Sequence, residues 1–172
     1  MTKYQELSIS NPAYNGCRCL LLLMGIVVIG AIALPLFLAG PRDKTRTFEA
    51  KQYLSSINHV QKALFIEKSA FATSIDALGL GIKTETINFK YSIRVTKKAA
   101  FNYAVAKQND LKSYVGGVFL VPAKNFEPNT AKKEITTTAI LCEGDSPGTI
   151  KPAEPIYENG KIACGKGTTP VP

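Results

Sequence analysis

The longest apolar stretch of the chain extends from Cys19 to Pro41, and no charged residue lies between Arg18 and Arg42. A helix of about 23 residues rises ~1.5 Å per residue, which is enough to cross a ~30 Å hydrocarbon core. The stretch therefore predicts a single membrane-spanning helix over residues 19–41, after a leader or cytoplasmic flank over residues 1–18. A cleaved signal peptide is the alternative, but its apolar region is usually only ~7–15 residues long.

A second helical pattern follows the apolar stretch almost without a break. Apolar residues recur at i, i+4, i+7 and i+11, whereas polar residues occupy the other sides of the helical wheel; the apolar positions are Tyr53, Ile57, Val60 and Leu64. This spacing predicts an amphipathic helix over residues 44–68, with one face available for packing against a sheet.

Strand patterns occupy the next part of the chain. Apolar and polar residues alternate over 89–95 and again over 101–106, and two apolar or β-branched runs follow at 116–122 and 135–143. Alternation with a period of two is typical of strands that bury one face. Four strands joined by short connections indicate an antiparallel sheet within residues 86–143, so the fold class is α+β. We expect the amphipathic helix to cover the apolar face of this sheet.

The C-terminal residues 144–172 are rich in glycine and proline, which disfavours a helix or a central strand. A disulfide between Cys142 and Cys164 could close this part of the chain into a loop. Such a bond is worth about 3 kcal/mol in the chain-entropy model and requires an oxidising compartment. Two free thiols remain the alternative.

The net charge of +8 describes a basic protein. Lysines and arginines are spread along the chain, which is typical of a soluble surface, although a basic surface can also attract nucleic acid or acidic polysaccharide. The densest local group consists of Lys90, Arg94, Lys97 and Lys98. We treat these four residues as the candidate basic binding surface.

No motif for catalysis, cofactor binding or metal binding stands out. His59 is the single histidine, and no cysteine or acidic residue lies at metal-ligand spacing from it. The chain also lacks a nucleophile-elbow motif and a paired-cysteine redox motif. The sequence therefore predicts a protein that is not an enzyme and that holds no cofactor or metal.

Several segments resemble the type IV pilin-like G/H family of cyanobacterial pilin-like proteins. They include the whole of 49–86, LKSYVGGVFLVPA at 111–123, TTAILCE at 137–143 and CGKGTT at 164–169, whereas IGAIALPLF at 29–37 resembles the end of the hydrophobic half of a type IV pilin N-terminal helix. The resemblance implies a long N-terminal helix, an antiparallel sheet packed on its C-terminal half, and a disulfide-closed C-terminal region within a globular domain over 42–172. It also implies an anchor in the cytoplasmic membrane, a domain facing the periplasm or exterior, and partners among other pilin or secretion-system subunits.

The chain departs from the pilin pattern at the site where a prepilin peptidase cuts. Pilins are similar in carrying a glycine followed by Phe-Thr-Leu-Ile-Glu. One alignment places Ala13 and Tyr14 at the cut, and another places Gly16 and Cys17 there. Neither keeps the motif, and the first puts Arg18 where the glutamate belongs. These four residues are the candidate processing site, although Cys17 and Cys19 could instead carry a lipid or remain free thiols.

Two functions are compatible with these features. The first is a minor pilin or pseudopilin of a type IV pilus or a type II secretion system. The second is a permanently tethered periplasmic module that binds DNA, polysaccharide or a protein partner.

Overall fold

The computed structural model describes residues 42–123 and 134–172. The predicted leader 1–18 and the predicted membrane helix 19–41 lie outside these residues. Within the two described ranges, no helix combines the length and the apolar character needed to cross a membrane.

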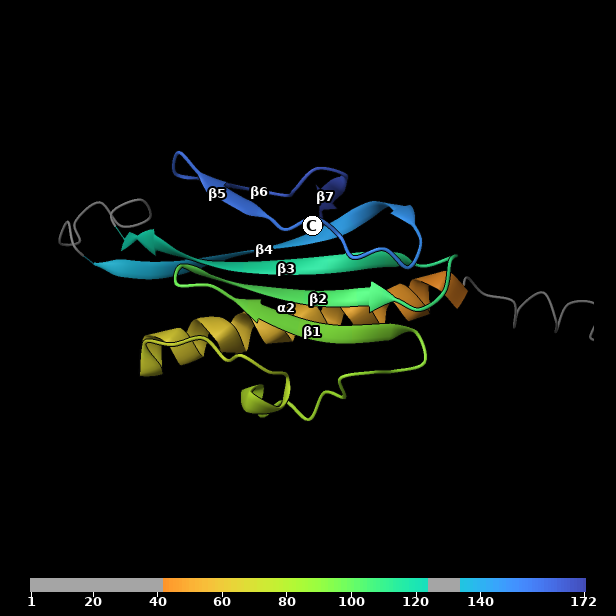
Figure 1. The fold of residues 1–172 in the computed structure, drawn as a ribbon, viewed down its shortest axis with the longest axis horizontal. Helices are drawn as coiled ribbons and strands as arrows, with labels where there is room; N and C mark the ends of the chain where they lie inside the picture. Colours follow the sequence, from red (N-terminus) through yellow and green to blue (C-terminus); the bar gives the residue numbers. More distant parts are fainter. Residues whose placement is uncertain (1–41, 124–133) are drawn as a thin grey trace, which may run out of the picture. The chain divides into compact units, whose positions relative to one another are not determined.

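The chain forms a long helix, a five-stranded sheet and a small hairpin (Figure 1). The elements are α2 (Arg42–Lys68), the 3-10 turn η1 (Asp76–Leu78), β1 (Phe89–Val95), β2 (Ala99–Ala106), β3 (Lys112–Pro122), β4 (Ile135–Pro147), β5 (Ile156–Glu158), β6 (Lys161–Ala163) and β7 (Thr168–Pro170). The sheet has the order β1-β2-β3-β4-β7 and is antiparallel throughout, whereas β5 and β6 pair only with each other. The prediction of an α+β fold with an antiparallel sheet is confirmed.

The prediction of four strands is wrong, because the C-terminal segment contributes β7 as a fifth. Cys142 and Glu143 of β4 lie opposite Pro170 and Thr169 of β7. A proline is tolerated there because β7 is an edge strand, whose outer side has no partner strand. The disulfide between Cys142 and Cys164, which was predicted, brings the tail to the outer edge of β4.

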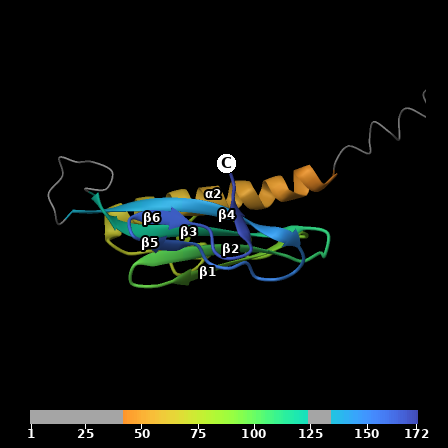
Figure 2. The same ribbon diagram turned by 90° about the horizontal axis from the view of Figure 1, so that it is seen from above.

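Helix α2 lies along one face of the sheet (Figures 1 and 2). The residues buried most completely against the sheet lie at i, i+4, i+7 and i+11, the spacing of one helical face: Ala50, Leu54, Ile57 and Gln61. Of the predicted face only Ile57 is fully buried, and Tyr53, Val60 and Leu64 are half-buried along its border. The face of α2 that is buried against the sheet is therefore rotated by about one residue from the predicted apolar face. Unlike the predicted face, it includes polar residues such as Gln61.

The large apolar side chains of the sheet are divided between its two faces. Phe89 and Tyr91 of β1 face α2, beside Ala106 and Ala104 of β2. Phe101, Tyr103, Val115 and Phe119 face the other way, and they pack against Tyr157, Ile162 and Cys164 of the tail. The tail is thus a third layer, and β2 is buried at seven of its eight positions because it is covered on both sides.

Two consecutive glycines in the middle of β3 let both outer layers approach the sheet closely. A Cβ atom on Gly116 would lie 2.9 Å from Cγ of Asn58 on α2, and closer still to the amide atoms of that side chain. A Cβ atom on Gly117 would lie 3.1 Å from Cγ of Pro155 in the tail and 2.8 Å from the ring of Phe119. Because side chains alternate along a strand, one glycine serves the helix and the next serves the tail.

Candidate functional site

A small network of amide side chains is buried between α2 and the sheet. Asn102 Nδ2 donates a hydrogen bond to Asn58 Oδ1 at 2.8 Å, and Asn58 Nδ2 donates to the carbonyl of Ile140 at 3.1 Å. Gln61 is bonded to both backbone groups of Ala72, accepting from its N–H at 2.8 Å and donating to its carbonyl at 2.9 Å. These hydrogen bonds join α2 to β2, β4 and the following loop, and so fix the position of the helix on the sheet. Neutral amide side chains do not act as a catalytic acid or base.

The acidic side chain of Glu49, near the beginning of α2, is satisfied inside the domain. The Glu49 carboxylate accepts hydrogen bonds from Thr86 Oγ1 at 2.7 Å, from Tyr91 Oη at 3.0 Å and from Asn88 Nδ2 at 3.2 Å. Burial, together with the hydrogen bond to Glu49, raises the pKa of the Tyr91 phenol. Tyr91 therefore stays protonated and serves as a donor.

Glu143 on β4 is held between two lysines. Its carboxylate lies 3.1 Å from Lys51 Nζ on α2 and 2.8 Å from Lys112 Nζ on β3. Burial opposes ionisation of Glu143, but the hydrogen bonds from the two lysines outweigh it and hold the pKa of this carboxyl below its usual range. The contacts join the helix to the sheet through the Glu143 carboxylate.

The tail is held to the sheet by a second charged group, which we call the tail clamp: Glu154, Arg94, Tyr103 and Lys151. Arg94 Nε donates to Glu154 Oε1 at 2.6 Å, and Tyr103 Oη donates to the same carboxylate. Lys151 Nζ lies 3.8 Å from the centre of the Tyr103 ring. Burial opposes ionisation of Glu154, but its two donors outweigh burial and lower its pKa.

Replacing Glu154 with glutamine is expected to lower the free energy of unfolding by about 1 kcal/mol, because two charge-assisted hydrogen bonds weaken. The folded-state pKa of Glu154 is depressed, so its stabilisation is present above the unfolded-state pKa near 4.5 and is lost as pH falls through the folded-state value. Denaturant unfolding from pH 7 down to pH 3 would measure both effects, with Glu158→Gln as the control on the exposed hairpin. If the free energy of unfolding falls between pH 7 and pH 3 by the same amount in Glu154→Gln as in the unaltered chain, the tail clamp does not stabilise the domain.

The four residues of the candidate basic binding surface do not form one patch. Lys90 lies near the start of β1, whereas Lys97 and Lys98 lie beyond its end, about 23 Å further along at ~3.3 Å per residue. Arg94, between them, is paired with Glu154 and lies over the ring of Phe101 at 4.7 Å. The structure thus brings Arg94 to the tail and leaves the lysines exposed at opposite ends of the strand.

Residues 13, 14, 16 and 17 of the candidate processing site lie outside the described residues.

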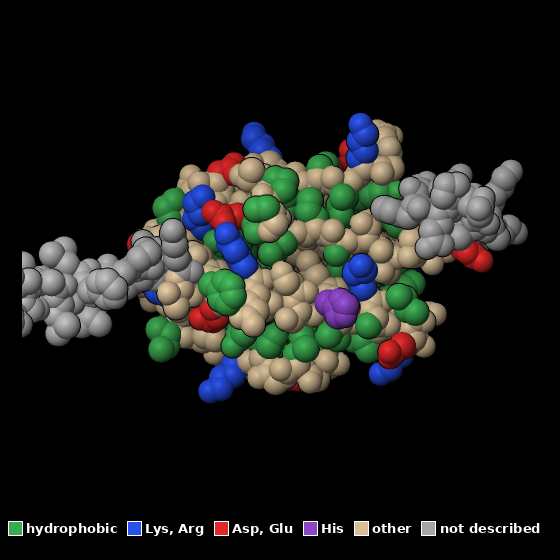
Figure 3. Space-filling view, turned by 180° about the vertical axis from the view of Figure 1, so that it is seen from behind, with side chains coloured by type: hydrophobic (Ala, Val, Ile, Leu, Met, Phe, Trp, Pro, Cys, Tyr) green, Lys and Arg blue, Asp and Glu red, His purple; other side chains and the backbone are tan. Residues whose placement is uncertain are grey.

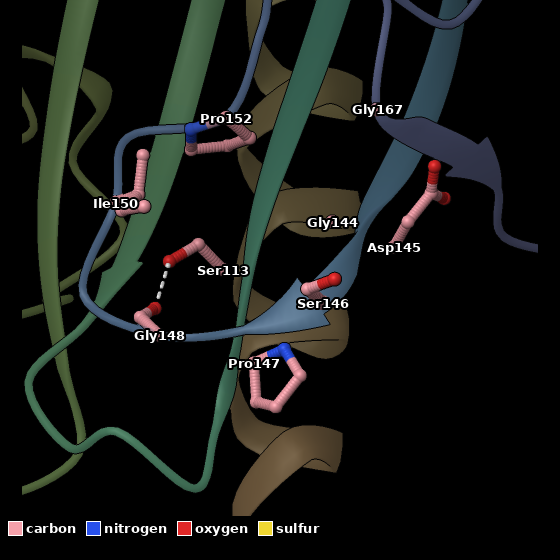
Figure 4. A pocket seen from close by; sticks show the side chains of 9 residues that line it. All are labelled: Ser113, Gly144, Asp145, Ser146, Pro147, Gly148, Ile150, Pro152 and Gly167. Atoms are coloured by element: carbon pink, nitrogen blue, oxygen red, sulfur yellow. Dashed lines mark hydrogen bonds between the residues drawn. The ribbon is translucent and has the colours of Figure 1, made fainter.

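Among the hollows on the described surface of the domain, we consider two. The larger one, of about 350 Å³, lies at the end of β4 and is lined by Ser113, Gly144–Gly148, Ile150, Pro152 and Gly167 (Figure 4). Ser113 points into it and donates to the carbonyl of Gly148 at 3.2 Å. Its one ionisable lining residue, Asp145, accepts a hydrogen bond from Thr169. This hollow therefore contains no acid–base pair of the kind that general catalysis needs.

The smaller hollow, of about 240 Å³, lies between α2 and β4 and contains His59 (purple in Figure 3). His59 and Lys62 are its ionisable lining residues, beside Ser55, Asn58 and residues 139–141. Across residues 42–123 and 134–172, no three histidine, cysteine, aspartate or glutamate side chains are grouped so that they could hold a metal ion.

Sequence reasoning missed the tail clamp, the amide network and the role of the two glycines. For the network a signal was present, because Asn58 and Gln61 interrupt the apolar positions around Ile57 and Leu64 of a predicted amphipathic helix. For the clamp none was present, since Arg94 and Glu154 are sixty residues apart in the chain.

A family model described as type IV pilin-like G and H matches residues 48–165, which is more than half of the chain. The matched part extends from the first turns of α2 through the sheet strands β1–β4 and the disulfide to the tail hairpin. Comparison with curated proteins and comparison with solved structures each gave no match.

Proposed function

The chain belongs to the type IV pilin-like G and H family, and from this premise we propose that it is a minor pilin or pseudopilin, anchored in the cytoplasmic membrane or assembled through its N-terminal segment. The family points to a pilin-like role, to association with a membrane or pilus, and to assembly with other pilin subunits, and it is generally non-enzymatic. That this filament is a type IV pilus or part of a type II secretion system is our proposal. The observation that carries it is the match of the family model to residues 48–165, which covers most of α2 and the sheet strands β1–β4.

The outward side of α2 supports a role in contacts between subunits. Its exposed residues include Phe48 and Ile66, which are 63% and 72% exposed, with Gln52, Ser55 and His59 between them. No acidic residue occurs between Glu49 and Glu67, and of the two lysines in this stretch, Lys51 is paired with Glu143 of the sheet. Phe48, Gln52, Ser55 and Ile66 are uncharged, and uncharged surface is easier to bury against a neighbour than charged surface, because little desolvation cost opposes the contact.

The disulfide supports a location outside the cytoplasm. Disulfides persist in oxidising compartments, and the bond between Cys142 and Cys164 joins a fully buried strand residue to the tail. We therefore propose that residues 42–172 face the periplasm or the exterior.

A tethered module that binds DNA, polysaccharide or a protein partner is the second candidate. The feature in its favour is the altered cut site, where neither Ala13–Tyr14 nor Gly16–Cys17 is followed by the pilin motif. Arg18 would also meet the new N-terminal amine of a neighbouring subunit as a like charge in an apolar filament core, which is unfavourable. A chain that is not cut would remain a fixed anchor.

The mass and N-terminal sequence of the protein extracted from its native membrane separate the two candidates. For a pilin-like subunit we expect a chain that starts at Tyr14 or Cys17 with a methylated amine. Ala13→Asp and Gly16→Asp form a matched pair, because each should block cutting in one alignment and leave the other unaffected. An uncut N-terminus in the unaltered chain, or an acyl group on Cys17, would exclude filament assembly by this route and favour the tethered module.

A further inference from the structure

Strand β4 has an outer edge that is only partly paired. On that side β7 covers Cys142–Gly144, and the Val171 N–H adds one hydrogen bond to the carbonyl of Leu141. No other strand of the described chain pairs with Ile135–Ala139 on the outer side, although β3 pairs with these residues on the inner side. Five residues, about 17 Å of strand, are thus left open.

The backbone groups that point outward on this edge can be assigned from the hydrogen bonds. Residues of an antiparallel strand direct their N–H and C=O groups alternately to the two sides. The carbonyl of Leu141 points out toward Val171, and that of Glu134 points in toward the N–H of Ala123. The N–H and C=O groups of Ile135, Thr137 and Ala139 therefore point outward, and within residues 42–123 and 134–172 they have no hydrogen-bond partner.

The open segment lacks the features that usually protect an edge strand. Its sequence, ITTTA, contains neither charge nor proline, and the irregularity in the pairing of β3 with β4 lies at Lys112 and Tyr114, toward the other end. The opposite edge of the sheet is different, since Thr84 accepts a hydrogen bond from the Tyr91 N–H of β1. Unprotected, β-branched edges readily accept another strand.

The hollow beside the open edge has a positive character. Its helix wall includes Ser55, His59 and Lys62, its strand wall begins at Ala139, and none of its lining residues is acidic. Thr137 is only 8% exposed, and its hydroxyl has no hydrogen-bond partner in the described part of the chain. A chain lying along β4 would place side chains over this wall.

We propose that Ile135–Ala139 is a docking edge for an extended segment of a partner protein, which adds to the sheet as a strand and places a carboxylate beside Lys62. Main-chain hydrogen bonds would give the affinity and the carboxylate would select the partner. A second copy of this chain fits less well, because antiparallel pairing of two β4 edges about a two-fold axis would bring Lys62 of one copy toward Lys62 of the other. The proposal concerns the globular domain and does not depend on how the N-terminus is processed.

The test uses the full chain and a synthetic seven-residue peptide of alternating threonine and valine with a central glutamate. We expect the labelled peptide to bind and to slow amide hydrogen exchange in residues 135–141. A peptide N-methylated at the amides that face β4 should bind at least about tenfold more weakly, because it cannot complete the ladder. Lys62→Glu should weaken binding about tenfold, whereas Lys68→Glu, on the same helix outside the hollow, should have little effect.

Several results would overturn the proposal. They are the absence of binding at about 1 mM peptide, protection from exchange at another segment, or equal binding of the N-methylated peptide. Equal effects of Lys62→Glu and Lys68→Glu would remove the carboxylate from the proposal. Slow exchange of 135–141 that rises with protein concentration and needs no peptide would identify a second copy as the occupant instead.

Discussion

Replacing Gly116 with alanine is expected to lower the free energy of unfolding by about 1–3 kcal/mol, the usual cost of adding a methyl group to a filled interior. The new Cβ would lie 2.9 Å from Cγ of Asn58, whose amide is fixed by Asn102 and by the carbonyl of Ile140. Either the helix must move away from the sheet or the amide network must break. Chemical denaturation of the variant and of the unaltered chain would measure the difference.

Gly117→Ala is the matched control, because it adds the same methyl group to the opposite face. It should displace the tail around Pro155 and leave the amide network intact. The double variant Gly116→Ala with Asn58→Ala should lose less stability than the sum of its single variants, since the collision is absent. Strict additivity of these two changes would contradict the close approach of helix and strand.

Removing the disulfide is expected to lower the free energy of unfolding by about 3 kcal/mol in the chain-entropy model. The bond joins residues separated by 22 positions, and it ties β4 to the segment that covers the second face of the sheet. Reduction of the unaltered chain, followed by denaturant unfolding, isolates this effect without changing the volume of a side chain. Cys142→Ala with Cys164→Ala should cost somewhat more, because Cys142 is fully buried.

The disulfide and the tail clamp should act together on the same segment. With the bond reduced, the contacts of Glu154 with Arg94 and Tyr103 still hold the tail over β2. Limited proteolysis should therefore cut within residues 149–165 slowly after reduction alone, and much faster after reduction of Glu154→Gln. Equal unfolding midpoints for the oxidised and reduced chains would show that the disulfide adds nothing to stability.

The third layer explains why the sheet differs from an ordinary two-layer packing. Phe101, Tyr103 and Phe119 face away from the helix, so without the tail they would form an exposed aromatic surface. Covering such a surface is favourable at roughly 25 cal/mol per Å² of apolar area. The glycine- and proline-rich tail can lie flat on it, and Gly117 gives Pro155 the necessary space.

The sequence alone determined the elements that depend on local patterns. A 3.6-residue period placed the helix that forms α2, alternation located β1 and β2, and β-branched residues marked β4. The two distal cysteines likewise allowed the observed bond to be anticipated. Each of these signals lies within a short window of the chain, where the geometry of a helix or a strand by itself fixes which residues share a face.

The tertiary structure alone decided how these elements are covered and which polar residues meet. The alternation of apolar and polar residues predicted that Arg94 lies on a solvent-exposed face of β1. In the structure it instead pairs with Glu154 of the tail. The fifth strand and the second covered face depend on the disulfide delivering that tail to β4. Which residues of the outer edge of β4 meet β7 is likewise decided by the tertiary pairing. Such contacts join residues far apart in sequence, and which of them form depends on packing the whole domain, a property that no short window of residues carries.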